Sequence, residues 1–160
     1  MSEAWSGGCQ CGEVRYRFSE KPSGAHICHC RMCQKAFGAF YAPLVGAPRS
    51  SFAVTRGEIA LFRSSDLVER GFCRNCGTPL TFAYVEGDWM SVSIGSLDDP
   101  SAFPPVDQHG VEGRLPWAND LGHLPDRRST EDESPDTAAA IAASNHQHPD
   151  HDTATWPAKQ

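Results

Sequence analysis

Seven cysteines lie in three short groups of this 160-residue chain, and their spacing is that of metal ligands. The groups are Cys9-Gln10-Cys11, Cys28-His29-Cys30-Arg31-Met32-Cys33 and Cys73-Arg74-Asn75-Cys76. Four thiolates complete one tetrahedral zinc site, and the remaining three leave a second zinc ion with an open position. A closed zinc site stabilises a fold, whereas an open one can activate a bound group. The cysteine count therefore predicts two zinc ions with different roles.

The first and last groups are expected to form the structural site. Two residues separate Cys73 from Cys76, so both sulfurs can reach one ion, and Gly77 permits a tight turn after the second ligand. A single residue separates Cys9 from Cys11, and the glycines on both sides allow the backbone to bend until the sulfurs converge. The alternative is two unrelated, redox-active thiol pairs.

The central group is expected to form the catalytic zinc site. Its ligands would be Cys28, Cys30 and Cys33, and the cations Arg31 and Lys35 beside them would favour the thiolate form. With no cysteine left over, the fourth position falls to a histidine, to water or to a substrate. We expect an open site, because a substrate thiol in that position would be activated by the metal.

Histidines are the protein groups that would close this second site. His26 and His29 are the neighbouring candidates, although His29, between two ligand cysteines, is expected to point away from the metal. His109 is a weaker candidate for a residue that faces the site. The histidines of the C-terminal region are interpreted as part of a polar tract, and these are His146, His148 and His151.

The segments that must position these cysteines have the period of β-strands. In residues 13–18 Val14, Tyr16 and Phe18 alternate with charged residues, which predicts a half-buried strand. Two short strands about Arg56-Gly57 are expected in residues 51–62, and further strands in 67–72, 80–85 and 89–94, with a hairpin turn at 86–88. A short helical turn is expected after Cys30. The fold class is thus mainly β, a small antiparallel domain.

Aromatic residues beside the central group have two interpretations. Phe37, Phe40 and Tyr41 either wall a pocket or begin the next buried strand. From Pro104 the chain is irregular, and we expect a C-terminal strap packed on the sheet with Trp117 as a core anchor.

Charge and composition divide the chain into two regions. Residues 1–128 carry fourteen acidic and thirteen basic residues, so this domain is nearly neutral and lacks the basic face of a nucleic-acid-binding protein. Residues 129–160 are acidic and poor in apolar residues, and we expect a disordered tail. The chain shows neither a secretory signal nor an apolar run of membrane-spanning length, so a cytoplasmic protein is expected.

Three segments resemble the signature blocks of a known family in both order and spacing. They are GGCQCGEVRYRF (7–18), CHCRMCQKAFGAF (28–40) and FCRNCGTPLTF (72–82). The family is that of the glutathione-dependent formaldehyde-activating enzymes, which also includes centromere protein V. The resemblance covers roughly residues 5–125. It implies a β-tent of antiparallel sheets around a structural zinc, with Cys28, Cys30 and Cys33 at a catalytic zinc approached by the thiol of glutathione.

The resemblance also implies a reaction, carbon–sulfur bond formation between glutathione and formaldehyde. We therefore expect a zinc-dependent carbon–sulfur lyase-type enzyme whose partners are a small-molecule thiol and an aldehyde. Two alternatives stay open at this point. One is a non-catalytic zinc module that binds a protein, and the other is a thiol redox sensor at the central cysteines.

Overall fold

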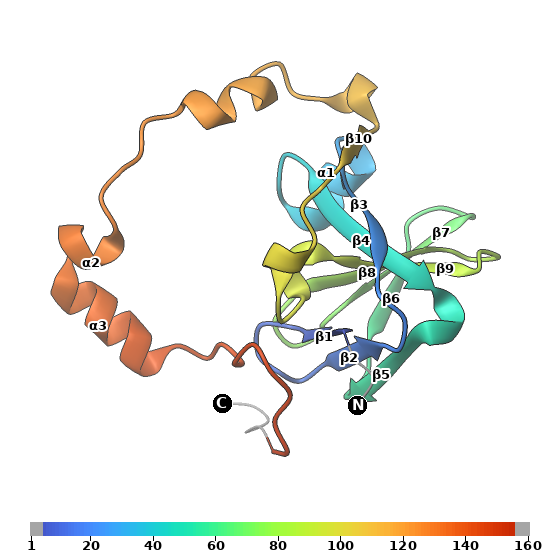
Figure 1. Cartoon of the computed structure of the whole chain (residues 1–160), viewed down its shortest axis with the longest axis horizontal. Helices are drawn as coiled ribbons and strands as arrows, with labels where there is room; N and C mark the ends of the chain where they lie inside the picture. The colour runs from blue at the N-terminus through green and yellow to red at the C-terminus, as the bar shows by residue number, and fades with distance from the viewer. Residues whose placement is uncertain (1–4, 156–160) are drawn as a thin grey trace.

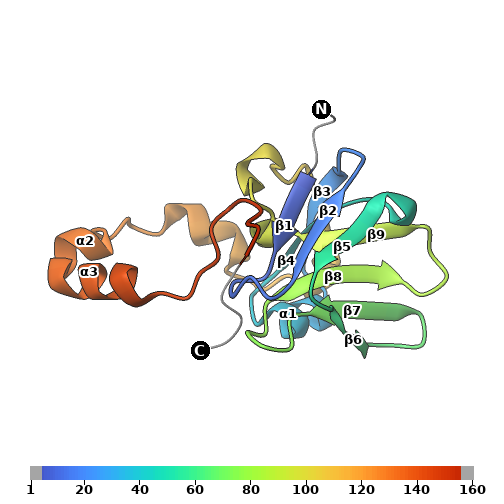
Figure 2. The same ribbon diagram turned by 90° about the horizontal axis from the view of Figure 1, so that it is seen from below.

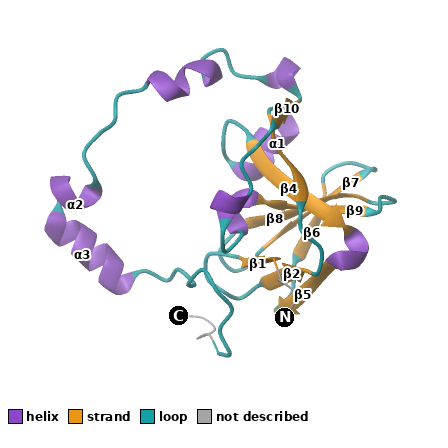
Figure 3. Cartoon of the chain, in the orientation of Figure 1, coloured by secondary structure: helices purple, strands orange, loops and turns teal. Residues whose placement is uncertain are grey.

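Two β-sheets form the body of the protein in a computed structural model that describes residues 5–155 (Figure 1). The strands are β1 (Trp5–Gly8), β2 (Arg15–Phe18), β3 (Ser23–Cys28), β4 (Ala42–Pro48), β5 (Phe52–Arg56), β6 (Ala60–Arg63), β7 (Val68–Phe72), β8 (Pro79–Tyr84), β9 (Trp89–Ser93) and β10 (Asp107–His109). The helices are α1 (Arg31–Phe37), α2 (Thr130–Glu133) and α3 (Pro135–Ser144), and five short 3-10 turns join them. The expected mainly β class is confirmed, and Figure 3 shows that strands form most of the body of the protein.

The smaller sheet has the order β1-β2-β5 and is antiparallel. In and just before its central strand, β2, the apolar residues that alternate with charged ones are fully buried; they are Val14, Tyr16 and Phe18. Their apolar side chains pack in the core, where Tyr16 and Phe18 both contact the ring of Phe52. The Tyr16 hydroxyl is satisfied by the Ser96 hydroxyl at 2.7 Å, so burial of this ring leaves no polar atom unpaired.

The larger sheet has the order β10-β3-β4-β9-β8-β7-β6. All its neighbouring strands are antiparallel except β10, which runs parallel to β3. Strands β8 and β9 pair across the expected hairpin turn. The core lies between the two sheets, where Val45, Leu80 and Val92 of the larger sheet meet the side chains of the smaller one (Figure 2).

The two strands expected in residues 51–62 are both present, but they belong to different sheets. Strand β5 pairs with β2, whereas β6 pairs with β7. The chain crosses between the sheets at Gly57, whose φ of 66° lies in the left-handed region. A Cβ atom there would lie 2.1 Å from the Glu13 carbonyl oxygen, so only glycine fits this crossing.

The strap after β9 packs on the sheet over a shorter length than expected. Its β10 strand pairs with β3, and Gly113 lies against the backbone of His29. Beyond that point the chain leaves the sheet. Trp117, expected to be a core anchor, is 49% exposed and contacts only the edge of Phe40 among the aromatic rings described, so that expectation is wrong.

Residues 129–155, expected to be disordered, contain α2 and α3. Ser129 caps α2, Pro135 begins α3, and an alanine-rich run favours helix there. Figures 1 and 2 show both helices away from the sheets, with no residue of either one buried. The division into a domain of residues 1–128 and a tail remains a prediction.

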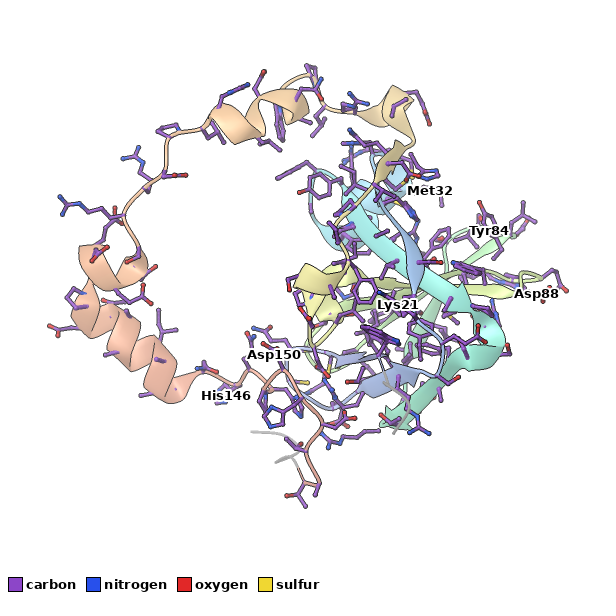
Figure 4. All side chains as sticks on the ribbon, viewed as in Figure 1. Lys21, Met32, Tyr84, Asp88, His146 and Asp150 are labelled. Carbon is purple, nitrogen blue, oxygen red and sulfur yellow. The ribbon has the colours of Figure 1, made fainter. Side chains whose placement is uncertain are left out.

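The chain then returns to the small sheet, and Figure 4 places Asp150 beside it. The backbone N–H of His148 donates to the Gln10 carbonyl at 2.7 Å, and the Asp152 carboxylate accepts from the Arg15 guanidinium at 2.9 Å. The His148 side chain is buried by this contact. Polar anchors therefore hold the segment, which its low apolar content did not predict. No helix within residues 5–155 is long and apolar enough to span a bilayer.

Candidate zinc centres and thiol cavity

The structure brings the first and last cysteine groups together at one end of the core. Their four sulfur atoms all lie within 4.8 Å of one another, and the members are Cys9, Cys11, Cys73 and Cys76. Cys9 Sγ lies 3.6 Å from Cys11 Sγ, which in turn lies 3.9 Å from Cys73 Sγ. Sulfurs about 2.3 Å from a tetrahedral zinc are about 3.8 Å apart. The four-sulfur group thus has the dimensions of a closed zinc site, and no disulfide joins the cysteines of the described chain.

Two tight turns hold these sulfurs in place. Gly12 donates to the Cys9 carbonyl and Gly77 donates to the Cys73 carbonyl, and both glycines have φ above 70°. The Val14 N–H also donates to Cys9 Sγ at 3.2 Å. Backbone donors directed at a sulfur stabilise a thiolate, the form in which cysteine binds metal.

Burial and backbone hydrogen bonds act in opposite directions on the pKa of three of these thiols, Cys9, Cys73 and Cys76. Burial raises the pKa of Cys9 far above the ordinary value, and it also raises that of Cys73. Burial opposes the charge of Cys76 too, but hydrogen bonds with the side chain and backbone of Thr78 outweigh it and lower its pKa to about 6. The two thiols that resist ionisation, Cys9 and Cys73, need a nearby positive charge to become thiolates, and a bound dication supplies one.

The central cysteines also converge, at the junction between β3 and α1. The sulfurs of Cys28, Cys30 and Cys33 lie within 4.8 Å of one another. Cys30 is the N-cap of α1, and its Sγ accepts from the Cys33 N–H at 3.4 Å. This helical turn, expected after Cys30, directs the three sulfurs to one side. The described residues bring no fourth cysteine or histidine into this sulfur group, so its donor set fits a zinc ion with an open position.

The three central thiols do not share one protonation behaviour. Burial raises the pKa of Cys28 to about 12 and also raises that of Cys33. For Cys30, burial is outweighed by hydrogen bonds from the Cys33 backbone and from the neighbouring sulfurs, and its pKa is lowered. Cys30 is thus the central thiol that ionises most readily.

The cation beside this group is Arg70, which the sequence reasoning missed. Its Nη2 lies 3.4 Å from Cys33 Sγ, and its guanidinium stacks over Phe82 at 5.0 Å. Arg70 is 7% exposed and stands in β7, 37 residues from Cys33. Of the two cations expected to act here, Arg31 instead donates to the Gln34 side chain. No local signal marks Arg70, because only strand order places β7 near α1.

His29 lies where the sequence predicted, away from the sulfurs. It is 2% exposed, its Nε2 lies 2.9 Å from Gln108 Oε1, and its ring meets the edge of Tyr41. Tyr41 in turn contacts Phe40, so these two aromatic residues pack on the side of His29. Phe37 packs against the small cluster of Cys33, Ala42 and Leu44.

A cavity of about 340 Å³ opens beside the central group. Two of the three cysteines, Cys28 and Cys33, line it, together with Phe82 and Trp89. His26 and His109 also line it, with ring centres 4.5 Å apart. His109 thus faces the same space as the sulfurs, which the sequence suggested only weakly. The cavity has the apolar walls and few polar groups typical of a small-molecule site.

Comparison with known proteins agrees with this arrangement. The family model described as glutathione-dependent formaldehyde-activating enzyme matches residues 4–111. A protein of Schizosaccharomyces pombe named as an uncharacterized lyase is 28% identical over 83 residues, which are 52% of this chain and 60% of that protein. The chain therefore spans less than two thirds of that relative.

A solved structure supports the fold independently. The crystal structure of a Rhodobacter sphaeroides protein superposes with a TM-score of 0.53 at 23% identity, covering 64% of this chain and 98% of the other. At this identity the likeness concerns the fold alone. The family match spans all three cysteine groups and most of both sheets, and on this ground the chain belongs to the family of glutathione-dependent formaldehyde-activating enzymes.

Proposed function

We propose that this protein is a zinc-dependent carbon–sulfur lyase-type enzyme that joins a thiol, glutathione or a similar one, to formaldehyde or another small aldehyde. The observation that carries the proposal is the group of three cysteines without a fourth sulfur, two of which, Cys28 and Cys33, line a cavity of about 340 Å³. Family membership and the lyase-named relative support the reaction class.

The proposed reaction is an addition that needs no redox partner. The substrate sulfur forms a bond to the carbonyl carbon, the C=O π bond breaks toward oxygen, and the thiol proton ends on that oxygen. The product carries a hydroxymethyl group on sulfur, and the reverse of this step is a carbon–sulfur cleavage. A zinc ion held by Cys28, Cys30 and Cys33 would supply a Lewis acid that favours the substrate thiolate.

The chain's own residues supply the rest. The cavity walls, which include Phe82 and Trp89, hold thiol and aldehyde together, which replaces a bimolecular encounter. Arg70 balances charge behind the sulfurs, because three thiolates and one dication leave one net negative charge. Cys9, Cys11, Cys73 and Cys76 would hold the structural zinc. Because thiols persist in a reducing compartment, we place the reaction in the cytoplasm.

The test uses the zinc-loaded full chain with glutathione and ¹³C-labelled formaldehyde. NMR exchange measures the rate of interconversion between the free aldehyde and its S-hydroxymethyl adduct (a hemithioacetal), and this rate is compared with the uncatalysed one. Cys30→Ser is the informative variant, because serine is a preferred N-cap and keeps the cap of α1. We expect acceleration by the wild type and none by Cys30→Ser, with unchanged circular dichroism.

Met32→Leu is the matched control, since Met32 lies in the same helix and is 45% exposed. It should retain the wild-type rate. If the wild type holds two zinc ions and gives only the uncatalysed rate with several thiols and aldehydes, the enzyme proposal is wrong and the non-catalytic zinc module is favoured. Reversible zinc loss on mild oxidation, without turnover, would favour the redox sensor.

A further inference from the structure

A third group of metal-ligating side chains stands apart from both cysteine groups. Ligand atoms of His26, Asp107 and His109 all lie within 4.8 Å of one another. The parallel pairing of β3 with β10 creates the group, because Asp107 is the register partner of His26. His109 is likewise the partner of Cys28, two residues beyond His26 on the same face of β3. No local motif links His26 to the other two residues, which lie more than 80 positions further along the chain.

The distances within the group are close to those between ligands of one metal ion. His109 Nε2 lies 3.2 Å from Asp107 Oδ1, and two such ligands about 2.1 Å from a tetrahedral zinc are about 3.4 Å apart. His26 Nδ1 lies 2.8 Å from the Gly24 carbonyl oxygen. This contact selects the tautomer that donates from Nδ1, which leaves the Nε2 lone pair available to a metal. Histidine ligands in metalloproteins are commonly oriented by such a carbonyl.

The position of the group indicates what a bound ion would face. His26 and His109 line the cavity that Cys28 and Cys33 also line, so the group stands at the wall of the same space. The side chains of Asp107 and His109 are each 58% exposed, so this is also where the cavity meets solvent. Three protein ligands leave at least one position of a tetrahedral ion free for water or a substrate group.

We propose that His26, Asp107 and His109 bind a third divalent transition-metal ion at the mouth of the cavity. Two imidazoles and one carboxylate select Zn²⁺, Co²⁺ or Ni²⁺ over Mg²⁺ and Ca²⁺, which prefer oxygen ligands. The exposed ligands make this ion more weakly held than the ions of the cysteine sites. The inference does not depend on the proposed lyase activity, because it concerns metal binding alone.

The test is a metal count on the full chain with its cysteine sites first filled with zinc. Co²⁺ is added, and bound zinc and cobalt are both measured after equilibrium dialysis, together with the absorption spectrum. Thiolate-bound Co²⁺ has sulfur-to-metal charge-transfer bands, whereas a site of histidine and carboxylate has none. We expect one metal ion per chain beyond those of the cysteine sites, without charge-transfer absorption.

Asp107→Asn and His109→Gln are the informative variants, since both side chains are exposed and neither change should disturb the fold. Each should weaken the additional Co²⁺ roughly 10-fold or more. His123→Ala, at an exposed histidine of the strap, is the matched control, and the double variant His146→Ala, His151→Ala tests the C-terminal histidines. Both controls should keep the additional ion.

Three results would overturn the inference. The first is a wild type that binds no ion beyond those of the cysteine sites. The second is an additional ion that survives both Asp107→Asn and His109→Gln unweakened. The third is an additional ion lost in the C-terminal double variant. If the lyase assay fails but the additional metal ion is found, only the proposed function is contradicted.

Discussion

Arg70 Nη2 lies 3.4 Å from Cys33 Sγ, and this contact joins β7 to the central cysteine group across the larger sheet. The Nη1 atom of the same guanidinium is buried and has no hydrogen-bond partner within residues 5–155. A buried cation with one unsatisfied donor is costly unless a neighbouring negative charge balances it. Three thiolates on a dication carry such a charge, so the contact supports an anionic metal–sulfur centre beside Arg70.

Replacing this cation should weaken the second zinc site specifically. Arg70→Met keeps an unbranched apolar stem but removes the guanidinium, which leaves the net negative charge of a zinc–trithiolate centre uncompensated in a buried place. We expect zinc in this site to be held roughly 10-fold less tightly, with the four-cysteine site unaffected. Competition with a chromogenic chelator measures both sites. Arg63→Met, at an exposed arginine on β6, is the control, and equal zinc retention in both variants would refute the role given to Arg70.

Loss of one ligand of the four-cysteine site should strongly destabilise the domain. A structural zinc contributes its binding free energy directly to folding. Cys76→Ser is therefore expected to lower the free energy of unfolding by several kcal/mol, on the scale of structural zinc binding. Denaturant unfolding followed by circular dichroism measures the loss. Cys30→Ser should unfold near the wild-type midpoint, and similar large losses in both variants would show that the two sites do not divide into structural and catalytic roles.

The ion pair between Arg15 and Asp98 should make stability depend on acid pH. Burial opposes the Asp98 charge, but hydrogen bonds from Arg15 and Ser6 and the charges of Arg15 and His148 outweigh it, so the pKa of Asp98 lies below its ordinary value. A carboxyl whose folded pKa is depressed stabilises the fold above its unfolded pKa of about 3.9, and that contribution disappears as pH falls through the folded pKa.

Asp98→Asn should therefore cost roughly 3 kcal/mol at neutral pH, because it leaves the buried Arg15 guanidinium with less compensating charge. The difference from wild type should shrink below about pH 4. Urea unfolding at a series of pH values measures it. Asp99→Asn, at the exposed neighbouring carboxylate, should show no such difference, and a pH-independent cost for Asp98→Asn would contradict the charge argument.

The segment around His148 should stabilise the domain by a modest amount. It contributes a backbone hydrogen bond to Gln10, an ion pair from the half-exposed Asp152 to Arg15, and a contact between the Thr153 carbonyl and Arg56. Ending the chain after Arg128 is expected to lower the free energy of unfolding by roughly 1 kcal/mol. Thermal unfolding of the two lengths measures this. Asp152→Asn measures the contribution of the ion pair alone. An unchanged unfolding midpoint in both the shortened chain and Asp152→Asn would show that the segment does not stay bound to the domain in solution.

The spacing of the cysteines was enough to predict which residues form the sulfur groups. The spacing of Cys73 and Cys76 before Gly77 predicts a turn with two convergent ligands, and the structure has that turn. The alternation at Val14, Tyr16 and Phe18 likewise identified the buried face of the smaller sheet. Such signals depend on residues close together in the chain, where short-range geometry decides the result.

The surroundings of the central cysteines depend on contacts between segments that are far apart in the chain. Arg70 reaches Cys33 because β7 belongs to the same sheet as β3, the strand that leads into the central cysteine group. His26 meets His109 because β10 runs parallel to β3. The position of Trp117 was predicted wrongly, because the hydrophobicity of an aromatic residue does not indicate whether the strap that carries it packs on the core. Likewise, the docking of His148 depends on polar partners supplied by β2 and the loop at Gln10. Contacts between distant segments are set by strand order and by pairing of the whole chain, which no local pattern encodes.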